Sequence, residues 1–143
     1  MSYGNALKSY QNTSIKTADT LQLVILCYER AIKDLEIAKQ LHENDALEDG
    51  YKSIRHAQDI ITELLLGLDY DRGGEISTNL SKIYNFMLRE LMGINSSKDT
   101  VVYGHIIRML AELKDAWEQV RKSALQLPSV SMESELRNWQ AMA

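Results

Sequence analysis

Apolar residues recur at spacings of three and four along most of the chain, and short polar stretches interrupt them. This spacing places the apolar side chains on one face of an α-helix, and no segment shows the alternation that is typical of a β-strand. The pattern predicts four helices with short connections, which favours an all-α, antiparallel up-down four-helix bundle. Their expected ranges are about Asp19 to His42, Asp45 to Leu66, Glu75 to Met92 and Lys98 to Leu125.

The polar stretches divide the chain into three parts: an N-terminal segment (1–16), a bundle domain (17–127) and a C-terminal tail (128–143). We expect the first part to be mobile and the tail to be loose. The glycine pair Gly73–Gly74 is expected to end a helix, because glycine adopts positive φ at little cost. A further polar break from Gly93 to Ser97 is expected to end the third helix.

The first helix carries more apolar residues than one packed face needs. Leu23, Leu26, Ile37 and Leu41 form a second stripe, opposite the expected core face. Isolated exposed apolar residues are common on any protein, but a stripe of them is typical of a groove that receives a partner helix. Further apolar residues lie off the core stripes of the second and third helices: Ile60, Leu88 and Met92.

The N-terminal segment contains Tyr3, Leu7 and Tyr10 at spacings of four and three. A short helix there would have one apolar face. Two interpretations remain open at this point. The segment is either a displaceable lid over the apolar groove or a disordered leader with a few aromatic residues.

Composition restricts the class of protein. The chain has 143 residues, of which 45% are hydrophobic and 25% charged, with a net charge of −4. This length predicts one domain, and the absence of a basic block argues against nucleic acid as a partner. No run of 18 apolar residues occurs, so membrane insertion is not expected. We expect a cytoplasmic location, where the single cysteine, Cys27, stays reduced.

Candidate chemistry is sparse. His42, His56 and His105 lack the spacing of a metal site, and we expect each of them at or near the surface. Cys27 and Trp117 lie on core stripes and are expected to serve packing. The sequence predicts neither an enzyme nor a bound cofactor or metal.

Several strings resemble one known family, the FliS-type flagellin export chaperones. The most specific is Leu68-Asp69, followed after four residues by Gly73-Gly74-Glu75-Ile76, and Asp115-Ala116-Trp117 supports the register. Residues 6–10 are similar to the N-terminal tyrosine motif of the family, and the resemblance covers about residues 5 to 122.

The resemblance implies a small cytoplasmic bundle that binds the disordered C-terminal segment of flagellin. It would prevent premature polymerisation and support delivery to the flagellar type III export apparatus, with export-gate and regulatory proteins as further partners. Tyr10 matches the tyrosine of the lid. Together with the off-stripe apolar residues this predicts a set of client-binding residues: Leu7, Tyr10, Leu23, Leu26, Ile60, Leu88 and Met92.

Two questions stay open from the sequence. The first is whether the client is flagellin. The alternative is that the chain is a regulatory adaptor, which binds another flagellar assembly-control protein through the same groove. The tail carries Met132, Leu136 and Trp139 at spacings of four and three, and it either docks on the bundle, joins the client groove or has no role.

Overall fold

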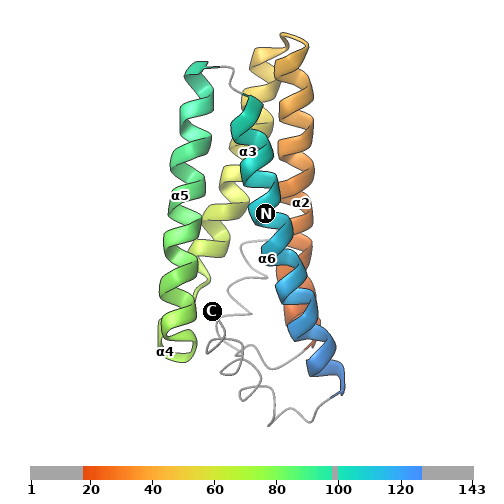
Figure 1. Cartoon of the computed structure of the whole chain (residues 1–143), viewed down its shortest axis with the longest axis vertical. Helices are drawn as coiled ribbons and strands as arrows, with labels where there is room; N and C mark the ends of the chain where they lie inside the picture. Colours follow the sequence, from red (N-terminus) through yellow and green to blue (C-terminus); the bar gives the residue numbers. More distant parts are fainter. Residues whose placement is uncertain (1–17, 98–99, 127–143) are drawn as a thin grey trace.

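The computed structural model describes residues 18–97 and 100–126. Four long helices run alternately in opposite directions (Figure 1), and a one-turn helix joins the second and third of them. The predicted antiparallel up-down four-helix bundle is therefore confirmed. The helices are α2 (Ala18–Glu43), α3 (Leu47–Leu66), the short α4 (Tyr70–Gly73), α5 (Glu75–Ser97) and α6 (Thr100–Gln126).

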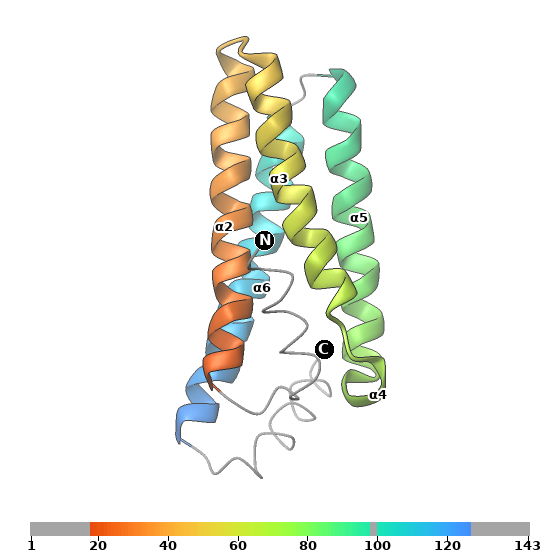
Figure 2. The same cartoon turned by 180° about the vertical axis from the view of Figure 1, so that it is seen from behind.

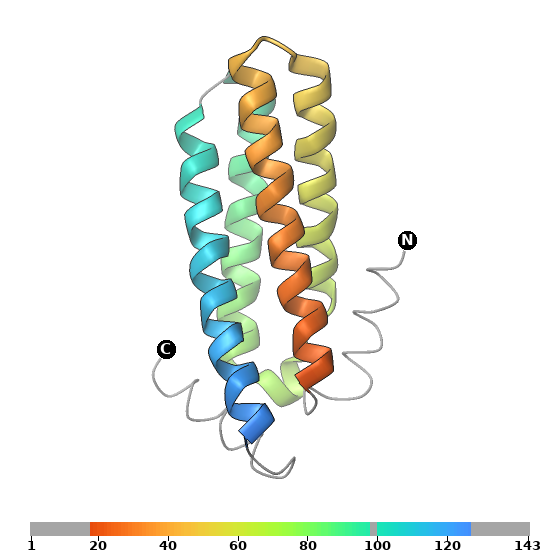
Figure 3. The same ribbon diagram turned by 90° about the vertical axis from the view of Figure 1, so that its right-hand side faces the viewer.

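The arrangement gives α2 two close neighbours. It packs along α3 on one side and α6 on the other, whereas α5 packs mainly on α3 and lies diagonally across the bundle from α2 (Figures 1 and 3). The α2–α3 turn lies at what we call the upper end. The start of α2, α4 and the end of α6 lie at the lower end (Figure 2).

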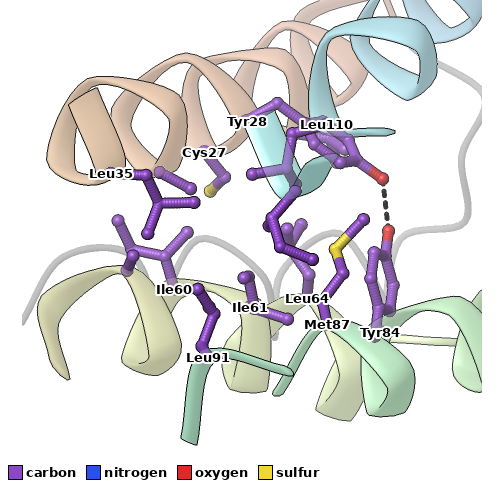
Figure 4. Close-up of a cluster of buried hydrophobic side chains, with 14 of the residues drawn as sticks. Cys27, Tyr28, Leu35, Ile60, Ile61, Leu64, Tyr84, Met87, Leu91 and Leu110 are labelled. Carbon is purple, nitrogen blue, oxygen red and sulfur yellow. Dashed lines mark hydrogen bonds between the residues drawn. The ribbon is translucent and has the colours of Figure 1, made fainter. Parts of the chain in front are cut away.

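The apolar faces of the four long helices meet in one core. Figure 4 shows part of it, in which Leu35 of α2 lies over Ile60 of α3. The core also contains a polar link, because the hydroxyls of Tyr28 and Tyr84 hydrogen-bond. Trp117 donates its Nε1–H to the Tyr28 hydroxyl at 3.2 Å, so this link joins α2, α5 and α6. The prediction that Trp117 serves packing is confirmed.

Two helix boundaries differ from the predicted ones. The third long helix continues through Gly93 to Ser97, because Ile94 on the next turn is only 1% exposed and its burial outweighs the weak helix propensity of glycine. The predicted end at Met92 is therefore wrong. At the upper end, Asp45 has a φ of 61° and belongs to the turn, so α3 starts at Leu47.

The glycine pair ends α4 rather than one of the long helices. The side chain of Asp69 caps α4 by accepting hydrogen bonds from the backbone N–H groups of Asp71 and Arg72, both at 3.1 Å. Gly74 then has a φ of 51°, which confirms the predicted helix-ending role of the pair. The sequence pattern did not predict α4 itself, since one helical turn is too short to show a period.

His42 lies in the core, which contradicts the expectation that every histidine lies near the surface. It is 4% exposed, and its Nδ1 shares a hydrogen bond of 2.8 Å with the Tyr103 hydroxyl of α6. Tyr51 of α3 makes an edge contact with the same ring. His56 and His105, by contrast, are half-buried and exposed, as expected.

Candidate binding surface

The second face of α2 carries a row of exposed apolar side chains. Leu23, Leu26 and Ile37 are each 39% exposed. At 100° per residue they point about 140–180° away from Tyr28, the buried residue at the centre of the inward face. The sequence predicted a stripe of these three residues and Leu41. The structure places Leu23, Leu26 and Ile37 on the outside of the bundle, whereas Leu41 is half-buried. We call Leu23, Leu26, Arg30 and Ile37 the outer stripe.

Arg30 lies within the outer stripe, four positions after Leu26, and sequence reasoning missed it. Its Nε is 3.3 Å from Oδ1 of Asp34, whose side chain is only 6% exposed. The other oxygen of that carboxylate, Oδ2, hydrogen-bonds to Nδ1 of His56 on α3. A buried carboxylate requires such partners, so the network holds Arg30 in place and ties the outer stripe to α3. The spacing of four between Arg30 and Asp34 was the available signal.

The candidates on α5 lie on another side of the bundle. Met92 is 62% exposed, and Leu88, one turn earlier on the same face, is half-buried against the core. Because α5 lies diagonally across from α2 (Figure 3), the structure does not bring Leu88 and Met92 into one groove with the outer stripe. A single partner that contacts both surfaces has to wrap around the bundle.

The prediction that Ile60 binds a client directly is wrong. Its side chain has no exposed surface and packs in the core beneath Leu35 (Figure 4). The physical reason is that α3 lies between α2 and α5 and buries a wide arc, so Ile60 and the adjacent Ile61 are both core residues. Leu7 and Tyr10, the two predicted lid residues, lie outside the described residues.

The described part of the chain offers little reactive chemistry. Residues 18–97 and 100–126 contain no group of three or more histidine, cysteine, aspartate or glutamate side chains that could hold a metal ion. Burial, helped by the nearby Glu63 carboxylate, raises the pKa of the Cys27 thiol to about 11, which keeps it protonated at neutral pH. None of the helices in these ranges has the length and apolar content to cross a membrane.

Known proteins that are similar to this chain belong to one family, the family that the sequence motifs resemble. The model of the family described as "Flagellar protein FliS" matches residues 3–124. The chain belongs to the FliS family. Among its relatives, "Flagellar secretion chaperone FliS" of Bacillus subtilis (strain 168) is 31% identical over 123 residues, which cover 86% of this chain and 91% of the relative.

Two further FliS relatives are similar over most of their length. "Flagellar secretion chaperone FliS" of Salmonella typhimurium is 29% identical over 84% of this chain and 93% of its own. "Flagellar secretion chaperone FliSB" of Pseudomonas aeruginosa is 30% identical over 80% of this chain and 94% of its own. The FliS match therefore spans the whole bundle, and it ends just before the tail.

Proposed function

We propose that this FliS-family protein is a cytoplasmic export chaperone that binds the disordered C-terminal segment of flagellin. In this role it prevents premature polymerisation and supports delivery to the flagellar type III export apparatus. The observation that carries the proposal is the outer stripe, in which Leu23, Leu26 and Ile37 expose apolar side chains. The relatives of this chain are named flagellar secretion chaperones.

The placement of the apolar surfaces supports a client that is disordered when free. A rigid partner meets one side of a bundle, whereas an unfolded segment can follow the outer stripe and then reach Leu88 and Met92 on α5. Such a client loses conformational entropy when it becomes ordered, so a large contact surface is needed to compensate. Two separate apolar surfaces on one small bundle provide it.

The first experiment compares two forms of flagellin. Full-length flagellin and flagellin without its C-terminal segment are each co-expressed with the tagged protein and purified. We expect only the full-length form to co-purify. Equal recovery of both forms would contradict the proposal, because the client segment would then lie elsewhere in flagellin.

The second experiment tests the outer stripe with a matched control. Burying what remains exposed of a leucine side chain contributes about 1 kcal/mol, so Leu23→Ser combined with Leu26→Ser should weaken flagellin binding by about 30-fold. Phe86→Ser is the control, because Phe86 is 41% exposed but lies on α5, on a different face from Met92. Calorimetric titration with the flagellin segment measures both affinities, and an equal loss in both variants would argue against the assignment.

A further inference from the structure

The C-terminal tail is a feature of this chain that its family match does not cover. The match ends at residue 124 and α6 ends at Gln126, so residues 128–143 follow both. Their apolar residues Met132, Leu136 and Trp139 are spaced four and three apart, which would align them on one face of a helix. In a helical tail this face would be stabilised by an apolar surface that covers it.

We propose that the tail docks on the outer stripe of α2 and competes there with the client. The competition rests on the proposed function, whereas the docking itself does not. Because the tail and the client would occupy the same stripe, docking of the tail lowers the apparent affinity for the client.

The geometry places the stripe within reach of the tail. Gln126 and the start of α2 both lie at the lower end, and α6 packs along α2 (Figures 1 and 3). Ile37 lies 14 positions after Leu23, so the stripe is about 21 Å long at 1.5 Å per residue. A helix of about 12 residues formed by the tail is about 18 Å long, so it can cover most of this distance.

Charge distinguishes the outer stripe from the other apolar surface near Gln126. The stripe contains Arg30, whose charge is balanced in part by Asp34 at 3.3 Å, and the exposed Lys33 close to it on α2 adds a further positive charge. In a helical tail, Glu133 and Glu135 would flank the apolar face on its two sides, within about 60° of it. Acidic flanks meeting basic residues favour this docking site.

The competing surface has the opposite charge. Leu66 and Tyr70 are 66% and 52% exposed at the lower end, but Asp69 and Asp71 lie beside Tyr70. Arg72, which is 3.7 Å from Asp69, balances only one of the two charges. These carboxylates would repel the acidic flanks of the tail. Met92 belongs to the last turns of α5, toward the upper end, and is farther from Gln126 (Figure 1).

Trp139 provides a direct test in the full-length protein. The chain has two tryptophans, and Trp117 is buried, so the difference between the wild type and Trp139→Phe isolates the fluorescence of Trp139. We expect acrylamide to quench this signal several-fold less in the folded protein than in urea. Quenching at the unfolded rate would overturn the docking.

Substitutions in the bundle then locate the docking site. Leu23→Ser with Leu26→Ser should raise the quenching of Trp139 toward its value in urea, and the matched control Phe86→Ser should leave it unchanged. Release by Phe86→Ser, or no release by the changes in α2, would overturn the assignment to the outer stripe. Circular dichroism confirms that each variant is folded.

Competition is measured separately, as the affinity for the C-terminal segment of flagellin. Leu136→Ser with Trp139→Ser should tighten binding by about 3- to 10-fold, because the binding-competent fraction of the protein rises. Equal affinities of this variant and the wild type would overturn the competition. A third outcome separates the two proposals. If Trp139 is protected and the changes in α2 release it, the docking stands. If the flagellin segment nevertheless does not bind, the proposed function fails.

Discussion

The two faces of α2 differ although they belong to one helix. On the inward face, Leu35 has no exposed surface and packs against α3 (Figure 4). On the outward face, Ile37 lies only two positions later and is 39% exposed. Both are large aliphatic residues, so side-chain type alone does not distinguish a core residue from a candidate contact residue.

The comparison shows what each face contributes. The inward face supplies stability, since it meets α3 and α6 and holds the Tyr28 hydroxyl link to α5 and α6. In the described part of the structure, Leu23, Leu26 and Ile37 on the outward face are partly exposed and lie outside the core. Residues there can therefore serve recognition at little cost in stability. Substitutions on the two faces should therefore have opposite profiles, with loss of stability on one and loss of binding on the other.

The largest effect is expected from Leu35→Ala on the inward face. Removing a fully buried leucine side chain leaves a cavity between α2 and α3, and we expect the free energy of unfolding to fall by about 3 kcal/mol. Urea unfolding followed by circular dichroism measures the change. Leu26→Ala is the control, with an expected loss below about 1 kcal/mol. Equal losses for the two leucines would mean that the two faces do not differ as described.

The next effect concerns the upper end of the inward face. A Cβ atom at Gly50 would lie 2.3 Å from Cδ2 of His42, whose ring is held by the hydrogen bond to Tyr103. Gly50→Ala should therefore destabilise the protein by about 1–2 kcal/mol, although alanine favours a helix.

A double-mutant cycle isolates the cause of this loss. In the His42→Ala background the clash is absent, so Gly50→Ala should become neutral or stabilising by up to about 1 kcal/mol. Unfolding free energies of the four proteins give the coupling. A destabilisation that persists without the His42 ring would show that the contact between Gly50 and His42 is not the reason.

Alkaline pH provides a smaller effect on the inward face. Burial raises the pKa of the Cys27 thiol from 9.0 to about 11 and that of the Tyr28 hydroxyl from 10.0 to about 12. Each group is protonated more strongly in the folded state, so its contribution is complete below its unfolded pKa and is lost as the pH rises toward the folded value.

For Cys27, this predicts a loss of about 1 kcal/mol between pH 9 and pH 10. Cys27→Ala should make the decline over this interval shallower by that amount, while the contribution of Tyr28 remains. Urea midpoints at pH 7, 8, 9 and 10 provide the test. The same slope in both proteins would contradict the assignment to the thiol.

The sequence predicted the fold because helical periodicity is a local property. The four long helices and the apolar members of the outer stripe were predicted from spacing alone, and the expected core residues Tyr28 and Trp117 are buried. The predicted end of the third helix failed because Gly93 was read as a break, although Ile94 continues the apolar stripe three residues after Leu91 and is buried.

The errors at Ile60 and His42 have a common origin. Ile60 appeared to lie off its stripe because the width of a buried arc depends on which helices flank α3, and that is known only from the tertiary arrangement. His42 is buried beside Tyr103, which is 61 residues away in sequence and whose hydroxyl hydrogen-bonds its Nδ1. Polar contacts between distant segments carry no periodic signal.

The smallest effect on stability is expected from Ile37→Gln on the outward face. The substitution removes the partly buried apolar surface of Ile37, which lowers the free energy of unfolding. Glutamine also favours a helix more than isoleucine does, which raises it, so the two contributions nearly cancel. We expect the free energy of unfolding to change by less than about 0.5 kcal/mol, whereas binding of the flagellin segment should weaken about threefold. Parallel urea unfolding and calorimetric titration measure the two quantities. A loss of stability comparable to that of Leu35→Ala would place Ile37 in the core and remove the distinction between the faces, because both would then serve packing.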